Sequence, residues 1–161
     1  MAVLDAAAFA AAVSPPTRLV GLDLGTKTIG FAVGDGAWMV AAPVTTIRRR
    51  KLQPDLDTLF ALMDERRAGG IVLGLPVNMD GSEGPRCQAT RAFARELLKR
   101  RDLPILLWDE RLSTSAVERQ MIEAADMSRR RRAQEVDQAA AAYILQGALD
   151  ALRRRRPDPA S

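Results

Sequence analysis

Residues 18–35, with the sequence RLVGLDLGTKTIGFAVGD, decide the fold. The stretch begins with an apolar run at residues 18–23, which predicts a buried strand followed by a glycine turn. TIGFAVGD, at residues 28–35, has the alternation of a second strand and ends in a Gly-Asp turn. AWMVAAPVTTI, at residues 37–47, follows immediately and predicts a third strand. Because tight turns join the three strands, we expect an antiparallel meander.

The chain beyond the meander alternates predicted helices with predicted strands. Residues 55–67 have the apolar spacing of an amphipathic helix. The runs GIVLGLP at residues 70–76 and ILLW at residues 105–108 are typical of buried strands. Further helices are expected at residues 85–101, 113–124 and 133–152. The pattern predicts an α/β fold with a mixed five-stranded sheet, in which the meander is antiparallel, the other strands are parallel and helices lie on both faces.

A chain of 161 residues is long enough for one domain with a sizeable core. We expect a flexible N-terminal leader at residues 1–16, a folded domain at residues 17–152 and a basic, polar tail at residues 153–161. No window of the sequence has the apolar length needed to span a bilayer, so no membrane association is expected. The alanine-rich start lacks the basic leading segment of a secretory signal. These features predict a cytoplasmic protein.

The chain contains no histidine. This absence excludes Ser-His-Asp and Cys-His catalysis, histidine-dependent acid–base nucleases and histidine-ligated zinc or iron sites. Cys87 is the only cysteine, so neither an intrachain disulfide nor a thiolate metal cluster can form within one chain. Any metal site would therefore consist of carboxylates and water, which favour hard cations such as Mg²⁺ or Mn²⁺.

The net charge is +4, and four runs contain most of the 24 basic residues. The runs lie at residues 48–51, 99–101, 129–132 and 153–156. One such run is typical of a solvated loop or helix end, but four in a compact domain indicate binding to a phosphate backbone. Aromatic residues make up only 4% of the chain and lie in apolar stretches, which disfavours a base-stacking platform. Nucleic acid is thus the expected partner.

Acidic residues occur at three places where ligand sites gather in open α/β sheets. Asp23 lies in an otherwise apolar strand, before a polar turn that contains Lys27. Asp109 and Glu110 follow the last predicted strand, and Asp137 lies near the start of an alanine-rich helix. Adjacent strand residues point to opposite faces, so Asp109 and Glu110 are not expected to bind one metal together. Structural interpretations also apply, namely a partnered buried carboxylate, a helix cap and a group favoured by a helix dipole.

Four stretches of the sequence form an ordered set of motifs. They are GLDLGTKTIGFAVGD at residues 21–35, GLPVNMDGSEGPRCQATRAFARELL at residues 74–98, DERLSTSAVERQM at residues 109–121 and VDQAAAAYILQGALD at residues 136–150. Together they resemble the YqgF family, the RuvX-type group that is similar to Holliday-junction resolvases of the RuvC kind. The resemblance implies an RNase H-like fold, a cytoplasmic location and a nuclease role in 5′-end processing of pre-16S rRNA, hence in ribosome biogenesis. Some members of the family are instead linked to four-way DNA junctions.

The resemblance also implies which residues form the site. Asp23, Glu110 and Asp137 would be the catalytic and metal-binding set, and whether Asp109 joins or replaces Glu110 is left open. Resolvases of the RuvC kind have a further acid three residues after the last one, where this chain has Ala140. Two Mg²⁺ or Mn²⁺ ions would bridge the scissile phosphate. The residues expected to contact nucleic acid are Lys27, Arg86, Arg111, Arg129, Arg130 and Arg131.

Other functions remain open at this point. The motif GLDLGTKTIG also resembles the first phosphate loop of actin-like kinases and ATPases, although those proteins need two such domains. A non-catalytic nucleic-acid-binding factor would retain the acidic site without cutting, and a Holliday-junction resolvase would act in DNA recombination and repair. The expected partners are structured RNA, branched DNA or ribosomal precursor particles, bound by a monomer or a homodimer.

Overall fold

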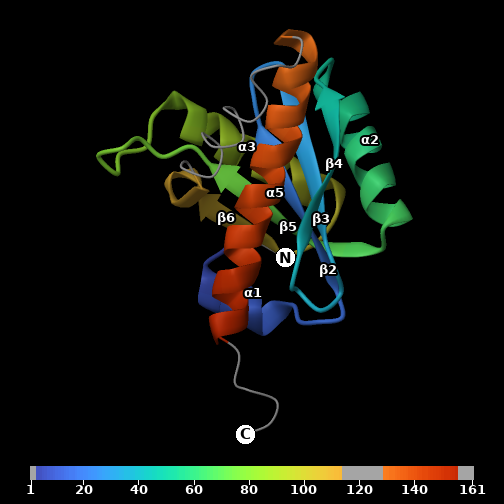
Figure 1. Ribbon diagram of the computed structural model, residues 1–161, viewed down its shortest axis with the longest axis vertical. Helices are drawn as coiled ribbons and strands as arrows, with labels where there is room; N and C mark the ends of the chain where they lie inside the picture. Colours follow the sequence, from blue (N-terminus) through green and yellow to red (C-terminus); the bar gives the residue numbers. More distant parts are fainter. Residues whose placement is uncertain (1–2, 114–128, 156–161) are drawn as a thin grey trace, which may run out of the picture.

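The computed structural model describes residues 3–113 and 129–155, with side chains for residues 3–112 and 138–155. Its centre is a six-stranded sheet in the order β1-β6-β5-β2-β3-β4 (Figure 1). The strands are β1 (Val3–Leu4), β2 (Arg18–Leu24), β3 (Thr28–Gly34), β4 (Ala41–Arg48), β5 (Ala68–Leu75) and β6 (Ile105–Asp109). Strands β1, β6, β5 and β2 are parallel, whereas β2, β3 and β4 form the antiparallel meander. The predicted mixed sheet is confirmed, but it has six strands rather than five.

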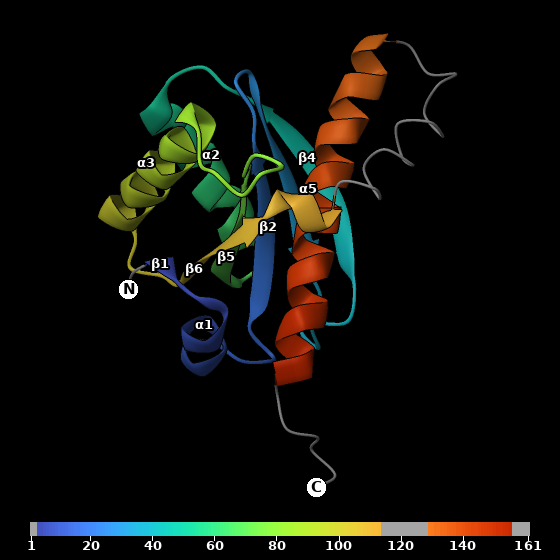
Figure 2. The ribbon, with the colours of Figure 1, turned by 90° about the vertical axis from the view of Figure 1, so that its left-hand side faces the viewer.

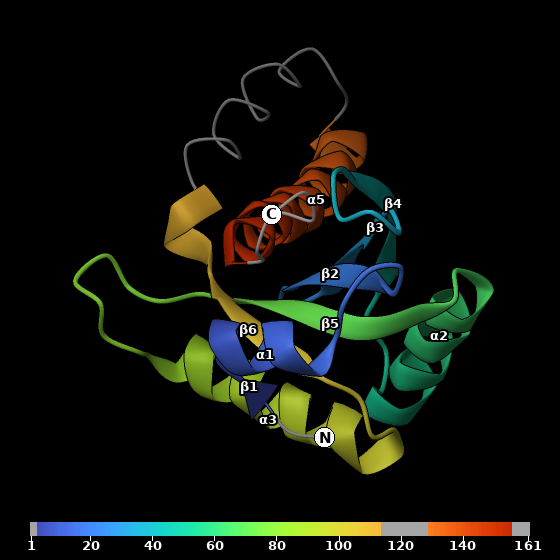
Figure 3. The same ribbon diagram turned by 90° about the horizontal axis from the view of Figure 1, so that it is seen from below.

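Helices cover both faces of this sheet (Figure 2 and Figure 3). They are α1 (Ala6–Ala12), α2 (Leu52–Glu65), α3 (Pro85–Arg100) and α5 (Arg129–Arg155), and a 3-10 helix, η1 (Glu110–Ser113), follows β6. Helices α2 and α3 pack on one face, where Phe31 and Phe93 belong to one buried cluster. Helices α1 and α5 pack on the other face, where Phe9 and Leu145 belong to a second cluster. Cys87 on α3 is a free, buried thiol.

The N-terminal segment is folded where the sequence indicated a flexible leader. Strand β1 pairs in parallel with β6, which adds the sixth strand. Asp5 caps α1 by accepting a hydrogen bond from the Ala8 amide at 2.8 Å. Phe9 is completely buried in the cluster that also contains α5 residues. The folded structure therefore begins before residue 16. The sequence did not indicate this, because a two-residue strand and one buried aromatic side chain leave no periodic pattern.

Helix α5 is longer than the helix predicted at residues 133–152. It runs from Arg129 to Arg155, so arginines on both sides of the apolar segment belong to it. Arginine is a good helix former, and cations in the last turn are stabilised by the helix dipole. The expected polar tail therefore begins inside the helix. The helix predicted at residues 113–124 lies outside the described residues, apart from Ser113 at the end of η1.

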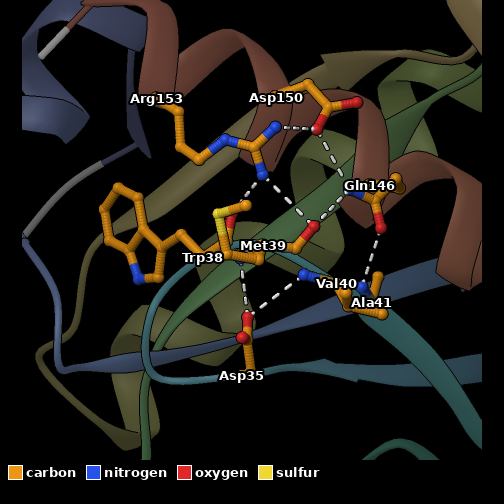
Figure 4. A network of polar contacts seen from close by, with 8 residues as sticks. All are labelled: Asp35, Trp38, Met39, Val40, Ala41, Gln146, Asp150 and Arg153. Carbon is orange, nitrogen blue, oxygen red and sulfur yellow. Dashed lines mark hydrogen bonds and ion pairs between the residues drawn. The ribbon is translucent and has the colours of Figure 1, made fainter.

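Hydrogen bonds connect α5 with the loop between β3 and β4 (Figure 4). Gln146 donates a hydrogen bond to the Met39 carbonyl at 2.9 Å and accepts one from the Ala41 amide at 2.8 Å. Arg153 donates to the carbonyl of Trp38 at 2.8 Å. The Trp38 side chain is itself completely buried. These contacts fix the position of α5 along the sheet.

Helix α5 approaches β2 closely at Gly21. A Cβ atom at this position would lie 2.7 Å from the Ala141 carbonyl oxygen and 2.7 Å from the Leu145 Cβ. The small residues Gly21 and Ala141 permit this close approach. Within residues 3–113 and 129–155, neither α5 nor any other helix is long and apolar enough to cross a membrane.

Candidate functional site

The candidate site lies at the edge of the sheet where β2, β5 and β6 end. Asp23 is the last residue but one of β2, and Glu110 comes directly after β6. Strand β5 lies between these two strands and is parallel to both. Because neighbouring parallel strands have their carboxyl ends at one edge, two acids that are remote in sequence come to the same place.

The side chains of Asp23 and Glu110 are in contact. Both residues are partly buried, and a hydrogen bond joins their carboxyl groups. Burial, and then the negative charge and hydrogen bond of Asp23, raise the pKa of Glu110 to about 8, whereas the nearby Arg86 lowers it. The two carboxyl groups therefore share a proton at neutral pH. Two acids that share a partly buried place are costly to ionise together, and a bound cation would remove that cost.

Gly74 of β5 provides the space for the Glu110 side chain. A Cβ atom at residue 74 would lie 2.6 Å from the Glu110 Oε1 and 2.6 Å from the Cδ1 of Ile144 on α5. Any larger residue would have to displace the carboxyl group or the helix. The backbone of β5 thus sets the distance at which α5 and Glu110 pass the end of the sheet.

Asp109 has a different partner from Glu110. Its carboxylate accepts hydrogen bonds from the Arg111 backbone amide at 2.9 Å and from the Arg111 Nη2 at 2.6 Å. The hydrogen bonds from Arg111 hold the pKa of Asp109 below its usual value. The two adjacent acids therefore have separate hydrogen-bond partners. Arg111, which was expected to contact phosphate, is held by Asp109 and keeps 36% of its side chain exposed.

The third acid of the predicted set, Asp137, lies in the part of α5 whose side chains are outside the described residues. The same applies to Arg129, Arg130 and Arg131. Among the side chains that the structure describes, no group of three or more histidine, cysteine, aspartate or glutamate residues could hold a metal ion. The described part of the site thus brings together two acids of the set.

An open pocket of about 530 Å³ lies beside Glu110. It is lined by residues 76–79 of the loop after β5, by residues 84–86 at the start of α3, and by Glu110 and Arg111. The loop between β5 and α3 projects from the body of the protein (Figure 3). Arg86 is exposed, and its positive charge is near enough to Glu110 to lower the pKa of that carboxyl group. Carboxyl and guanidinium groups in one open pocket suit a ligand that combines phosphate with a metal cation.

The basic run at residues 48–51 lies next to the turn that follows Asp23. The Arg49 backbone amide donates to the Lys27 carbonyl at 2.8 Å, and the Arg49 Nη1 donates to the Gly25 carbonyl at 2.7 Å. Lys27 and three members of the run are exposed. These side chains form a basic surface at the same end of β2 as the acid pair.

The other described basic runs are engaged in the fold. Their ion pairs are Arg100–Asp57, Arg101–Asp64 at 2.7 Å, Lys99–Glu96 at 2.9 Å and Arg153–Asp150 at 2.7 Å. The Arg101 guanidinium also lies over the Phe60 ring, 4.6 Å from its centroid. Arg100 and Arg101 connect α2 with α3, and Arg153 pairs within the end of α5. The three runs whose side chains the structure describes therefore have different surroundings.

Gly74 and Arg49 belong to the site although the sequence did not single them out. A glycine within a strand marks a close approach of another group, so the Gly-Leu-Pro at the end of β5 carried a signal for Gly74. Arg49 carried no signal of its own, because nothing in the sequence distinguishes it from the arginines on either side. Its hydrogen bond to the turn after Asp23 appears only in the fold.

Sequence comparison relates the chain to a family of nucleic-acid enzymes. A family model described as RuvX, Holliday junction resolvase, matches residues 17–151. A protein of Rhodospirillum rubrum is 62% identical over 160 residues, covering 99% of each chain. A protein of Phenylobacterium zucineum is 61% identical over 154 residues, covering 95% of this chain and 99% of the other. Both relatives carry the name "Putative pre-16S rRNA nuclease".

Two solved structures share the fold. The Thermus thermophilus RuvC in complex with a Holliday junction substrate matches with a TM-score of 0.51 and 12% identity, over 86% of this chain and 96% of that one. The yeast mitochondrial Holliday junction resolvase Ydc2 matches with a TM-score of 0.52 and 14% identity, over 94% of this chain and 87% of that one. At these identities the likeness concerns the fold alone, and it confirms the RNase H-like architecture that the sequence predicted.

Proposed function

Because the chain belongs to the RuvX family, we propose that it is a metal-dependent endonuclease that hydrolyses phosphodiester bonds of nucleic acid. The observation that carries this proposal is the contact between Asp23 and Glu110 at the open edge of the sheet. Asp23 comes from β2 and Glu110 directly follows β6, and Glu110 lines an open pocket together with Arg86. A purely structural acid pair would gain nothing from such a position.

The acid pair fits a divalent cation. Its oxygen ligands are those that Mg²⁺ and Mn²⁺ prefer, and the raised pKa of Glu110 reflects burial and negative charge that a cation would offset. Asp23 and Glu110 would hold the metal, and Asp137 on the helix that passes Gly74 is the third candidate ligand. Bound divalent ions supply Lewis-acid activation of the phosphate and of the attacking water. A second ion would be held by residues of the same acidic set.

The surrounding cations would hold the nucleic-acid backbone. Lys27 and the exposed arginines at residues 48 and 50 lie at the same end of β2 as Asp23, and Arg86 lines the pocket. Contacts of this kind fix the position of a strand without reading its sequence. Arg111 would contribute when phosphate competes with Asp109 for its guanidinium. Arg129, Arg130 and Arg131, at the start of α5, are further candidates.

The substrate that we propose is the 5′ region of the 16S rRNA precursor. Relatives at 62% and 61% identity over nearly the whole chain carry pre-16S rRNA in their names, and the 5′ region is the part that we propose. The protein would then act in ribosome biogenesis, in the cytoplasm, on naked precursor RNA or on ribosomal precursor particles. A four-way DNA junction is the second candidate, favoured by the description of the family and by the fold shared with two resolvases.

The two substrates are compared in one cleavage assay. A labelled precursor fragment that spans the 5′ end of 16S rRNA and a labelled four-way DNA junction are incubated with the full chain in Mg²⁺, Mn²⁺ or EDTA. We expect metal-dependent cutting of the RNA at a defined position and slower cutting of the junction. Preferred cutting of the junction would support resolvase activity instead. Binding to both without cutting in any metal would contradict nuclease activity and indicate a non-catalytic binding factor.

A further inference from the structure

Met79 is the most exposed of the large apolar side chains that the structure describes, at 83% of its surface. The others are Val3, Met39, Val40 and Leu112. Single exposed apolar side chains are common, so exposure alone indicates nothing. Met79 differs from the other four in its position, because within the described part of the chain it alone among them lines the pocket beside Glu110.

The loop that carries Met79 is held in one conformation by its own hydrogen bonds. The Gly81 amide donates to the Asn78 carbonyl at 2.8 Å, which closes a turn with Met79 and Asp80 at its centre. Gly81 adopts a φ of 90°, which favours glycine. The Asn78 amide donates to the Ser82 carbonyl at 2.9 Å, and the Ser82 amide donates to Asp80 at 2.9 Å. Little further ordering is needed when a ligand meets this loop, which favours binding.

The pocket offers two kinds of surface to a ligand. On its polar side are the Arg86 guanidinium, Arg111 and the Glu110 carboxyl group, whereas Met79 provides an exposed apolar surface at the loop. A nucleotide has matching parts, a charged phosphate and a flat, largely apolar base. The described phenylalanines are all buried, so no phenylalanine in that part of the chain could receive the base.

We propose that the Met79 side chain packs against a nucleobase of the bound strand, next to the phosphate that a cation at Asp23 and Glu110 would hold. This inference rests on the proposed nuclease function and specifies how the same site recognises its substrate. Methionine is one of the apolar side chains that proteins insert against or between bases. Only an unpaired or unstacked base presents its face to such a side chain. The contact therefore selects strands with an open base beside the cut, rather than regular duplex.

The test is a binding experiment with the full chain. The probe is an RNA hairpin with a single-stranded 5′ extension that carries 2-aminopurine at one extension position at a time, and Ca²⁺ replaces Mg²⁺ to prevent cutting. We expect a fluorescence change at one position with the wild type. Met79→Ala should lose that change and bind about tenfold more weakly, because an apolar contact is lost. Met79→Leu should keep the fluorescence change and should bind with an affinity within about threefold of the wild type.

Met39→Ala is the matched control, because Met39 is also an exposed methionine but lies on the β3–β4 loop. It should behave as the wild type, and a blunt RNA duplex should bind wild type and Met79→Ala equally. Unchanged affinity and fluorescence in Met79→Ala, or an equal loss in Met39→Ala, would overturn the inference while leaving the nuclease proposal intact. A wild type that binds neither RNA would contradict the proposed function itself.

Discussion

The carboxyl groups of Glu110 and Asp23 are joined by a hydrogen bond, although one residue follows β6 and the other lies near the end of β2. The strand between them, β5, contributes Gly74, whose missing side chain leaves room for the contact. Three strands therefore determine the position of the acid pair. Substitutions of the acid pair, of Gly74 and of the surrounding basic residues should therefore have different effects on stability, cleavage and binding.

The raised pKa of Glu110 predicts a pH-dependent stability in the metal-free protein. The pKa rises from the ordinary 4.5 to about 8 in the fold, so the folded form binds the proton more tightly. This stabilisation is complete below the unfolded pKa and is lost as pH rises through about 8. The glutamine in Glu110→Gln does not titrate. Between pH 5 and pH 9 the free energy of unfolding of this variant, relative to that of the wild type, should therefore rise by more than about 1.4 kcal/mol, the value of one pKa unit.

Urea unfolding in EDTA at both pH values measures this difference. Parallel pH dependences for the wild type and Glu110→Gln would show that the two carboxyl groups do not share a proton.

Substitution of Gly74 should disturb the site and the packing of α5 together. In Gly74→Ala the new methyl group would lie 2.6 Å from both the Glu110 Oε1 and the Ile144 Cδ1. Overpacking of this kind costs about 1–3 kcal/mol, and cleavage should fall with it. Gly84→Ala is the stability control, because its nearest neighbour would be the Asn78 Nδ2 at 3.5 Å. Equal unfolding free energies for the two variants would count against the close approach at Gly74.

The N-terminal segment should contribute to stability through Phe9. This side chain is completely buried, so Phe9→Ala should lower the free energy of unfolding by about 3–5 kcal/mol. Val3→Ala, at a residue that is 37% exposed, should cost much less. Denaturant unfolding of both variants provides the measurement. A loss below about 0.5 kcal/mol in Phe9→Ala would instead fit a flexible leader outside the domain.

The basic runs should separate into nucleic-acid contacts and structural contacts. Replacing Arg48 and Arg50 by alanine should weaken RNA binding and reduce the slope of log affinity against log salt by about 1 for each lost phosphate contact. Arg101→Ala is the comparison, because Arg101 pairs with Asp64 and lies over Phe60. It should lower stability and leave the salt slope unchanged. The opposite pattern would assign the backbone contacts to the run at residues 99–101.

Much of the sheet could be predicted because buried strands leave a continuous apolar signal. The runs at residues 18–23, 70–76 and 105–108 match β2, β5 and β6 to within two residues. Strand β1 could not be predicted, because two residues make no pattern and their pairing partner lies about a hundred residues away. The charge of the α5 arginines indicated a loop or helix end at residues 129–132 and a tail from residue 153. Charge did not distinguish these from a continuous helix, because arginine is a good helix former.

The candidate site was harder to predict from the sequence than the fold. The resemblance predicted Asp23 and Glu110 as site residues, and strand geometry predicted that Asp109 and Glu110 would not bind one metal together. That the first two touch depends on which strands are neighbours and on a glycine between them, neither of which a linear sequence reveals. In the same way, the basic runs with described side chains differ only in the fold, which brings acids such as Asp64 to one run and leaves another beside the candidate site.

The joint role of Asp23 and Glu110 as metal ligands is tested by cleavage of the labelled pre-16S rRNA fragment across a Mn²⁺ titration. The proteins compared are the wild type, Asp23→Asn, Glu110→Gln and Asp109→Asn, all with RNA affinity and folding measured in parallel. We expect the wild type to cut only with metal, and the first two variants to lose more than about 100-fold in rate while still folding and binding RNA. Asp109→Asn should stay within about tenfold of wild type, because its carboxylate pairs with Arg111. Cutting that persists in EDTA, or in Asp23→Asn, would contradict the assignment of this acid pair as the metal site.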